Sequence, residues 1–273
     1  MTQTRPSHRH AWIAGIIILI TAISSLAAVR HVSSNGQDGI YFHTLPPGAR
    51  LPSGTECARR VRASPSPESR SMNTMSNRTI GNHVEPSFFP PGDSAQVAKL
   101  AQQISGDFTG TTQQVLQWAA CKWGIDQNVV FAQAAVESWW QQDELGDWTA
   151  NAELCPPDHR IGADGKPGEC PQSYGILQNR YSLEKSAWPG IGVSTAMNAD
   201  AAYAIWRSCY DGYEVWLNKV SDGRPYRAGD LWGCIGRWFS GDWYTPNALR
   251  YIDLVKKDFS EQVWLQPNFA RAS

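Results

Sequence analysis

The stretch from Asn128 to Trp139 constrains the fold of this chain more than any other, because apolar side chains cover a helix of this sequence on almost every side. Such a helix is stable only where the rest of its domain buries it. Its only polar interior positions are Gln133 and Glu137, which stand four residues apart. We therefore predict a largely buried helix that carries an amide and a carboxyl group on one face.

The chain on both sides of this stretch shows further helical periodicity and several residues that favour the start of a helix. These candidate starts are Asp93 or Ser94, Thr111 or Thr112, Asp126, Ser194 or Thr195, Gly229-Asp230 and Thr245-Pro246. The helix that begins at Ser194 or Thr195 is expected to run to about Val220. The stretch SYGILQNRY, residues 173–181, has strand character instead. Residues 93–267 are thus predicted to form one mainly α (α+β) domain with a small β region.

The N-terminal residues have the pattern of an export signal. Residues 1–10 form a basic region, and residues 11–29 form an apolar run. Ser25-Leu26-Ala27 offers a cleavage site, but the run is also long enough to span a bilayer as an anchor. We expect either a cleaved signal peptide or a retained transmembrane segment. Both alternatives place the rest of the chain outside the cytoplasm, in the cell envelope or secreted.

Residues 30–92 are rich in Pro, Ser, Gly and Arg and lack a long helical period, so we expect a linker there. Cys57 is the exception, because a disulfide at this position would hold its surroundings to the folded domain. The folded domain itself is expected to begin at residue 93.

Six cysteines all follow the apolar run, and this even number suits three disulfides in an exported chain. Cys155 and Cys170 flank a loop with the turn pairs Asp164-Gly165 and Pro167-Gly168, which favours a bond between these two cysteines. The remaining expected pairs are Cys209–Cys234 and Cys57–Cys121. Metal ligation is the alternative use of the cysteines, but no CxxC spacing occurs.

Composition disfavours several kinds of chemistry. The formal net charge is −1, so no overall field attracts nucleic acid. Only His159 among the six histidines lies beyond residue 83, which disfavours a zinc site with two histidines in the domain. The sequence contains no HExxH, no GxSxG and no Gly-rich phosphate loop after a strand. We expect no metal and no cofactor, and carboxylates are left as the candidate catalytic groups.

Glu137 is the strongest candidate among the carboxylates. Burial and the negative end of the helix dipole both favour the protonated form of a carboxyl group at the end of an apolar helix. A protonated carboxyl near neutral pH is what a general acid for glycoside cleavage requires. The alternative is a structural carboxylate in a hydrogen bond or ion pair.

Twelve of the thirteen tryptophans lie between Trp118 and Trp264, which suits a cleft that stacks on sugars, although most are expected in the core.

Residues 95–265 resemble the soluble lytic transglycosylase family, whose catalytic domain has a lysozyme-like fold with a cleft. The catalytic Glu of this family stands in an E-S pair at a helix end, which Glu137-Ser138 matches. A Gly-(Leu/Ile)-(Leu/Met)-Gln motif follows in the family, and Gly175-Ile176-Leu177-Gln178 matches it here. A family Asn at the start of the next helix corresponds to Asn198, and a Tyr of the final helix corresponds to Tyr251.

The chain departs from the family before its last helix. The family usually has Ala-Tyr-Asn-Ala-Gly there, whereas residues 237–241 read Arg-Trp-Phe-Ser-Gly, so the Asn that helps to shape the cleft is missing. The resemblance implies that Gln178 and Tyr251 orient Glu137 or the substrate. It also implies that Tyr174 and Trp238 line the cleft, with Ser138 at the substrate site.

The family resemblance implies that peptidoglycan glycan strands are cleaved between N-acetylmuramic acid and N-acetylglucosamine. Glu137 would act as acid and then as base, closing a 1,6-anhydro ring. One alternative is a muramidase that uses water and a second carboxylate. Its candidates are Asp143, Glu144, Asp147 and Asp242, for each of which a solvated or capping role is favoured. The other alternative is a non-catalytic peptidoglycan-binding module. We expect a monomer that contacts the membrane only if residues 11–29 stay uncleaved.

Overall fold

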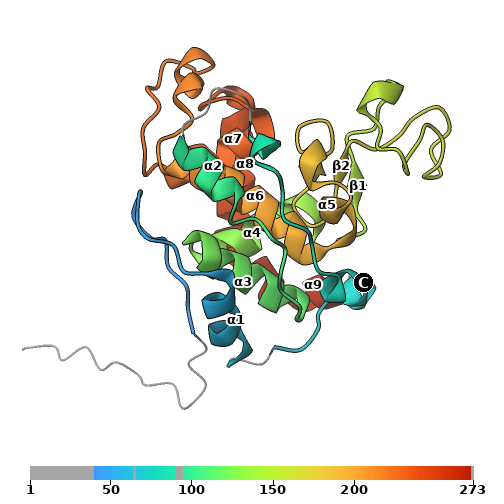
Figure 1. Cartoon of the computed structure of the whole chain (residues 1–273), viewed down its shortest axis with the longest axis horizontal. Helices are drawn as coiled ribbons and strands as arrows, with labels where there is room; N and C mark the ends of the chain where they lie inside the picture. Colours follow the sequence, from blue (N-terminus) through green and yellow to red (C-terminus); the bar gives the residue numbers. More distant parts are fainter. Residues whose placement is uncertain (1–39, 64–65, 90–94, 272–273) are drawn as a thin grey trace, which may run out of the picture. The chain divides into compact units, whose positions relative to one another are not determined.

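The computed structural model describes residues 40–63, 66–89 and 95–271 (Figure 1). The basic region at 1–10 and the signal peptide or anchor at 11–29 lie outside the described residues. No helix within the described part is both long and apolar enough to cross a membrane. Helices make up most of the regular structure and accompany one three-stranded sheet, which confirms the mainly α class with a small β region.

The described chain contains nine α-helices, three short strands and several single turns of 3₁₀ helix. The helices are α1 (Gly54–Arg62), α2 (Ala95–Ala101), α3 (Thr112–Trp123), α4 (Gln127–Ser138), α5 (Gly190–Val193), α6 (Thr195–Tyr210), α7 (Leu231–Ser240), α8 (Pro246–Glu261) and α9 (Pro267–Arg271). The strands are β1 (Leu145–Gly146), β2 (Ser173–Tyr174) and β3 (Asn179–Arg180).

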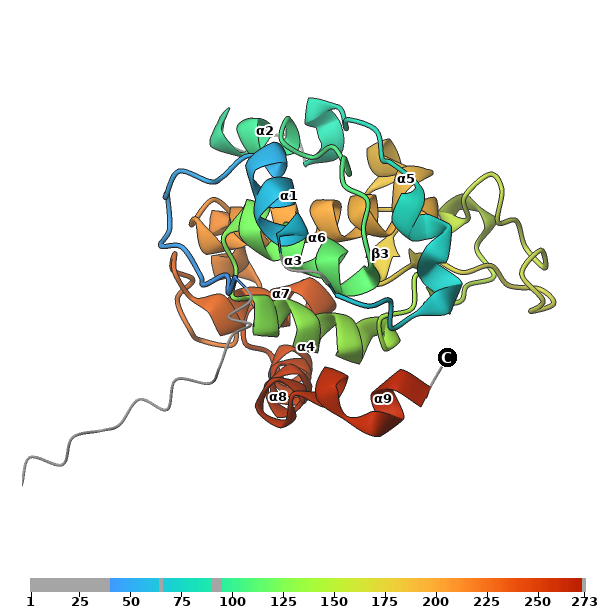
Figure 2. The ribbon, with the colours of Figure 1, turned by 90° about the horizontal axis from the view of Figure 1, so that it is seen from below.

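Five of the helices contact one another in a closed cycle. Helix α4 packs against α3 and α8, α3 packs against α6, and α7 joins α6 to α8. Figure 2 shows α4 between α3 and α8. Val130, Ala132 and Ala134 of α4 have no exposed surface at all. The apolar pattern of residues 128–139 therefore identified correctly a helix that its neighbours enclose.

Polar side chains cap the five helices of the cycle at positions that the sequence indicated, whereas the expected cap at Asp93 or Ser94 lies outside the described residues. Each cap accepts a hydrogen bond from a backbone N–H group in the first turn of its helix, which would otherwise lack a partner. The capping residues are Thr111 for α3, Asp126 for α4, Ser194 for α6, Asp230 for α7 and Thr245 for α8. Local chemistry thus fixes where each helix of the cycle begins.

Helix α6 ends at Tyr210 and not near Val220, so the expected length was wrong. Gly212 adopts a left-handed conformation with φ of 89°, which turns the chain away from the helix axis. Residues Val215–Lys219 form a separate 3₁₀ turn, in which Leu217 is fully buried. The apolar spacing beyond Tyr210 therefore reflects the packing of this turn and not a longer helix.

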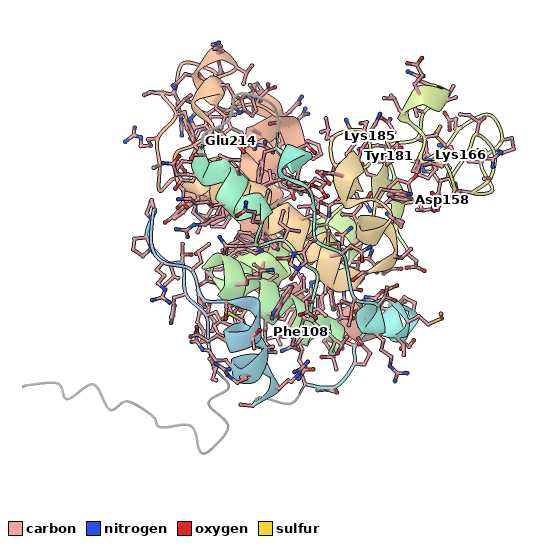
Figure 3. All side chains as sticks on the ribbon, in the orientation of Figure 1. Phe108, Asp158, Lys166, Tyr181, Lys185 and Glu214 are labelled. Atoms are coloured by element: carbon pink, nitrogen blue, oxygen red, sulfur yellow. A yellow bond between two sulfur atoms is a disulfide. The ribbon has the colours of Figure 1, made fainter. Side chains whose placement is uncertain are left out.

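The three strands form an antiparallel sheet in the order β1-β2-β3. The chain between β1 and β2 forms an arm, residues 147–172, which projects away from the helices in Figure 1. Figure 3 shows Asp158 and Lys166 on this arm. A disulfide between Cys155 and Cys170 closes the arm.

Three disulfides connect the described residues, and they are the three pairs expected from the sequence. Cys57–Cys121 joins α1 to α3, and Cys209–Cys234 joins α6 to α7. Two of the three bonds thus tie helices together, whereas the third stabilises the arm.

The described residues between 40 and 89 pack against the helices, so the prediction of a linker over 30–92 was wrong for this part. Helix α1 packs on α3, with Val61 only 1% exposed. Arg70 and Asn73 have no exposed surface. The compact unit includes the described residues from 40 onward instead of beginning at residue 93. Hydrogen bonds between side chains and backbone groups hold much of this segment, and such contacts leave no periodic pattern in a sequence.

We predict that replacing both Cys57 and Cys121 by serine lowers the free energy of unfolding by about 4 kcal/mol, because the bond spans a separation of 64 residues. Loss of Cys155–Cys170, with a separation of 15, is expected to cost less, about 3 kcal/mol. Urea unfolding of the two double variants measures both values. A linker would tolerate the first change with no loss of stability, and that result would refute the packing of α1.

Candidate active site

Glu137 lies in the last turn of α4 and faces side chains from other helices of the cycle. The hydroxyl group of Tyr251 on α8 donates a hydrogen bond to Oε1 of Glu137. The indole N–H of Trp238 on α7 donates a second hydrogen bond to the same carboxyl group. Burial raises the pKa of Tyr203 on α6, and the negative charge of Glu137 raises it further. Glu137 as a whole residue is only partly buried.

The surroundings raise the pKa of Glu137 from its ordinary value of 4.5 to about 7. Burial is the largest cause, and the negative charge of Asp147 acts in the same direction. The hydrogen bonds from Tyr251 and Trp238 act in the opposite direction, because they stabilise the carboxylate. Burial outweighs both donors, so the carboxyl group is about half protonated near neutral pH.

A close approach between α7 and α8 brings Trp238 and Tyr251 to the end of α4. A Cβ atom on Gly236 would meet the side chains of Ile252 at 2.8 Å and Ala248 at 3.1 Å, so only glycine fits there without movement. Phe239 stacks on Tyr251 with 4.9 Å between the ring centroids and an interplanar angle of 6°. The Trp-Phe pair that departs from the family pattern therefore contacts the acid and its tyrosine.

Ser138 connects the end of α4 to the turn between β2 and β3. Its hydroxyl group donates a hydrogen bond of 2.9 Å to the carbonyl oxygen of Ile176 and accepts one of 3.1 Å from the backbone N–H of Gln141. Ser138 is buried. In the structure both of these bonds serve to join the two matched motifs in space, and the expected contact of Ser138 with substrate stays a prediction.

Two buried amides hold the same turn from the other side. Asn198 of α6 accepts a hydrogen bond of 2.9 Å from the backbone N–H of Leu177 and donates one of 2.8 Å to the carbonyl oxygen of Tyr174. Gln142 accepts a hydrogen bond of 3.1 Å from the backbone N–H of Ile176. Sequence reasoning named Asn198 only through the family and missed Gln142, although a glutamine five residues after the candidate acid was visible.

Gln178 shapes this turn and makes no hydrogen bond to Glu137. Its amide nitrogen donates to the carbonyl oxygens of Gly175 at 3.0 Å and Glu144 at 3.2 Å. Its backbone is left-handed, with φ of 53°. The expectation that Gln178 orients Glu137 directly is thus wrong, because both amide hydrogens are used within the sheet and its turn.

Tyr174 does not line a cleft, contrary to the expectation from the family. The residue is 1% exposed, and its hydroxyl group donates a hydrogen bond of 2.7 Å to the carbonyl oxygen of Pro171. Its ring packs against Trp188 and His159 at the base of the arm. Tyr181, labelled in Figure 3, contacts the same Trp188 ring. This aromatic cluster covers Tyr174 at the base of the arm.

Asp147 is the second carboxylate that acts on the acid, since its charge contributes to the raised pKa of Glu137. It follows β1 and accepts a hydrogen bond of 2.6 Å from Ser173 of β2. Arg180 of β3 pairs with the same carboxylate oxygen. Burial alone would raise the pKa of Asp147, but these two partners hold it below the ordinary value of 3.8. Asp147 therefore stays ionised at the pH where Glu137 is half protonated.

The two tryptophans after Glu137 form a tight turn that the N-terminal and C-terminal segments hold. Trp139 and Trp140 both have left-handed backbones, with φ of 56° and 64°. Arg70 donates a hydrogen bond of 2.8 Å to the carbonyl oxygen of Trp139, and Asn73 donates one of 2.7 Å to that of Trp140. Phe269 of α9 packs on both indole rings. Sequence reasoning missed Arg70 and Asn73, because they lie in the supposed linker.

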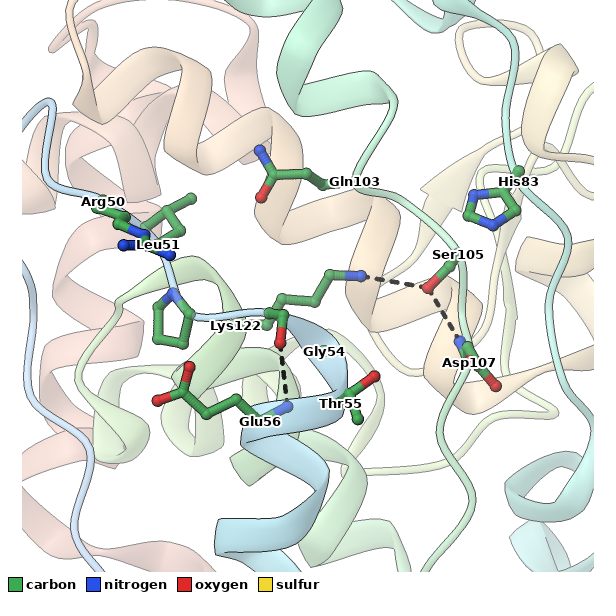
Figure 4. A pocket seen from close by; sticks show the side chains of 12 residues that line it. Arg50, Leu51, Gly54, Thr55, Glu56, His83, Gln103, Ser105, Asp107 and Lys122 are labelled. Atoms are coloured by element: carbon green, nitrogen blue, oxygen red, sulfur yellow. Dashed lines mark hydrogen bonds between the residues drawn. The ribbon is translucent and has the colours of Figure 1, made fainter.

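A hollow of about 580 Å³ lies elsewhere, between α1, the end of α3 and the chain after α2 (Figure 4). Lys122 lines it, but its ammonium group pairs at 2.6 Å with the buried Asp200. The lining contains none of the residues that surround Glu137. Among the described residues no group of His, Cys, Asp and Glu side chains could hold a metal ion. The environment of Glu137 therefore remains the candidate active site.

Comparison of the chain with models of protein families, with curated proteins and with solved structures found no match.

We predict that the free energy of unfolding of Glu137→Gln, relative to that of wild type, is higher at about pH 8 than at about pH 4 by about 1–3 kcal/mol. The pKa of Glu137 is higher in the folded protein, about 7, than its ordinary value of 4.5. The folded protein therefore binds this proton more tightly, and ionisation reduces the free energy of unfolding as the pH rises through this range. Glutamine removes that loss.

Urea unfolding of wild type and variant at both pH values measures this difference. The pKa of the buried Glu184 is also raised, to about 8, but Glu184 is present in both proteins and cancels. If the difference in free energy of unfolding between variant and wild type is the same at both pH values, Glu137 has an ordinary pKa.

Proposed function

We propose that this chain is a lytic transglycosylase that cleaves peptidoglycan between N-acetylmuramic acid and N-acetylglucosamine. One observation carries the proposal: Glu137, a residue that is only partly buried, has a carboxyl group with a pKa of about 7 whose partners, Tyr251 and Trp238, are hydrogen-bond donors. A group that is half protonated near neutral pH can give a proton and take one back at little cost. This property suits a reaction in which a single carboxyl serves as both acid and base.

The proposed reaction needs no water and no second carboxylate. The protonated Glu137 gives its hydrogen to the bridging oxygen as the bond from this oxygen to C1 of N-acetylmuramic acid breaks. The carboxylate then takes the hydrogen of the C6 hydroxyl group while the C6 oxygen bonds to C1. Between the two transfers, Tyr251 and Trp238 stabilise the carboxylate through the hydrogen bonds that they donate.

Two structural relations support a lysozyme-like arrangement as part of this proposal. The acid lies at the end of a buried helix beside a three-stranded sheet. The Glu137-Ser138 pair contacts the Gly175–Gln178 motif through the hydrogen bond from Ser138 to Ile176. The three disulfides favour an oxidising compartment outside the cytoplasm, where peptidoglycan is found.

A hydrolytic muramidase is the second candidate, and Asp147 is the observation that favours it. This carboxylate stands on the sheet side of the site, stays ionised and raises the pKa of Glu137. A retaining or inverting glycosidase requires such a pair, with one carboxyl protonated and the other charged. Arg180 and Ser173 both bind the same carboxylate oxygen of Asp147, Oδ2. These two contacts argue for a structural role of Asp147.

We predict that Glu137→Gln reduces the release of soluble fragments from purified peptidoglycan by about 10²–10⁴-fold, the usual contribution of a general acid. Glutamine keeps the size of the side chain and can still accept hydrogen bonds from Tyr251 and Trp238. Glu144→Gln is the matched control, since Glu144 follows Glu137 by seven residues in the sequence, its side chain takes no part in these contacts, and its replacement should leave the rate unchanged.

Equal digestion by wild type and Glu137→Gln would show that another group is the acid. Wild-type protein that binds sacculi but releases no fragments would instead identify a binding module without catalytic activity.

Wild-type activity is expected to fall as the pH rises above about 7, because Glu137 loses the proton that it must donate. Asp147→Asn removes the charge that raises the pKa of Glu137, so this decline should move to lower pH. At its own optimum pH the variant should lose less than about tenfold, since no step of the transglycosylase reaction uses Asp147. A loss of about 10²–10⁴-fold at every pH would favour the muramidase.

A further inference from the structure

We propose that Phe239 is a substrate-binding residue whose ring stacks on the apolar face of an N-acetylated sugar of the glycan strand, in a subsite beside Glu137. The inference rests on the proposed function, because it names a part of the glycan that the same site recognises. Phe239 stands where the family pattern has Asn, so the family resemblance assigns no role to its ring.

Phe239 holds an aromatic ring in solvent near the end of α7. Among the described residues it is the most exposed aromatic residue, with 59% of its surface accessible, and Tyr41 follows with 37%. Single exposed apolar residues are common on proteins, so exposure alone assigns no function to this ring. The position of the ring relative to the candidate acid is what distinguishes Phe239.

The ring of Phe239 covers the tyrosine that contacts the acid. The two rings are nearly parallel, with an interplanar angle of 6° and 4.9 Å between the centroids of Phe239 and Tyr251. Tyr251 is only 3% exposed, and its hydroxyl group donates a hydrogen bond to Glu137. A single side chain therefore connects Phe239 to the acid, and the accessible part of its ring lies beside the candidate active site.

The chemistry of N-acetylated sugars suits contact with such a ring. In a β-1,4-linked glycan the hydroxyl, N-acetyl and linkage groups leave the pyranose ring near its plane, so each face of the sugar presents C–H groups. The face of an aromatic ring carries partial negative charge, which attracts these hydrogens. Contact also removes apolar surface of both rings from water. Phenylalanine can thus bind a sugar although it has no hydrogen-bonding group.

The chain that follows Phe239 provides polar groups and open space. The hydroxyl group of Ser240 donates a hydrogen bond of 3.0 Å to the carbonyl oxygen of Gly236 and accepts one of 3.1 Å from the backbone N–H of Asp242. A Cβ atom on Gly241 would meet no other atom within 4 Å, so the space beside it is open. Aromatic rings next to a few polar groups are typical of ligand sites, whereas protein and membrane partners bind broad apolar patches.

This arrangement predicts an effect on binding and not on the chemical step. Phe239 reaches Glu137 only through Tyr251, so a sugar that stacks on its ring is not expected to be the sugar that reacts. Loss of the ring should therefore raise KM and leave kcat unchanged. A ring that served only to support Tyr251 would give the opposite result, a lower kcat at unchanged affinity.

The test compares Phe239→Leu with Phe239→Tyr in the full chain. Leucine keeps an apolar side chain against Tyr251 but has no ring, whereas tyrosine keeps the ring. Both changes are made in Glu137→Gln, so that glycan is bound and not cleaved. Isothermal titration calorimetry measures the Kd for soluble peptidoglycan strands freed of their peptides. Phe239→Leu should weaken binding about three- to tenfold, and Phe239→Tyr should keep most of the parental affinity.

With Glu137 intact, Phe239→Leu should raise KM for the same strands by about the same factor, with kcat near the wild-type value. Ile80→Ala is the control, because Ile80 is 57% exposed, nearly as much as Phe239, but has no ring and lies in the segment before α2. This control should change neither Kd nor KM. Phe239→Met replaces Phe239→Leu if the leucine variant does not fold.

The proposal is overturned if the Glu137→Gln parent does not bind the strands, if Phe239→Leu binds them as tightly as the parent, or if Phe239→Leu lowers only kcat. It is also overturned if Phe239→Leu abolishes a dimer seen in analytical ultracentrifugation without changing glycan affinity, since a second copy of the chain would then cover the ring. Failure of wild-type protein to cleave glycan would refute the proposed function, whereas the binding measurement, made without the acid, would still decide the role of Phe239.

Discussion

The enclosure of α4 by its neighbours is the constraint on which the candidate site depends. Helices α3 and α8 cover α4 directly, and α6 and α7 close the cycle around it. An apolar helix of this kind cannot face water, so its one carboxyl group near the C-terminal end must share the buried environment. The same packing places Trp238 and Tyr251 beside that carboxyl group, because α7 and α8 approach each other closely at Gly236.

Two opposing effects then set the protonation of Glu137. A buried carboxyl group without partners can reach a pKa of about 8–9, whereas hydrogen-bond donors can hold a carboxylate well below its ordinary pKa. The pKa of about 7 at Glu137 lies between these limits. Burial raises the proton affinity, and the donors from α7 and α8 keep the proton exchangeable. A site with only one of these effects would hold its proton too tightly or lose it too early.

The sequence predicted the parts of the molecule that follow from local chemistry or from apolar periodicity. Capping residues such as Asp126 and Thr245 marked helix starts correctly, and the pattern of α4 identified the buried helix. Prediction from the sequence failed where polar contacts between residues far apart in the chain determine the structure. Arg70 and Asn73 hold the turn after Glu137 from a segment that resembles a linker in composition. Tyr174 was assigned to substrate although it is buried.

Mass spectrometry of the soluble products that the wild-type protein releases from purified peptidoglycan tests the central claim most directly. The claim is that one carboxyl group both gives and takes the proton and that the sugar's own hydroxyl group replaces water. It predicts 1,6-anhydro-N-acetylmuramic acid ends, which are lighter by one water than hydrolysed ends. Products that carry only reducing N-acetylmuramic acid ends would contradict it and would assign the second carboxylate, Asp147, to the reaction.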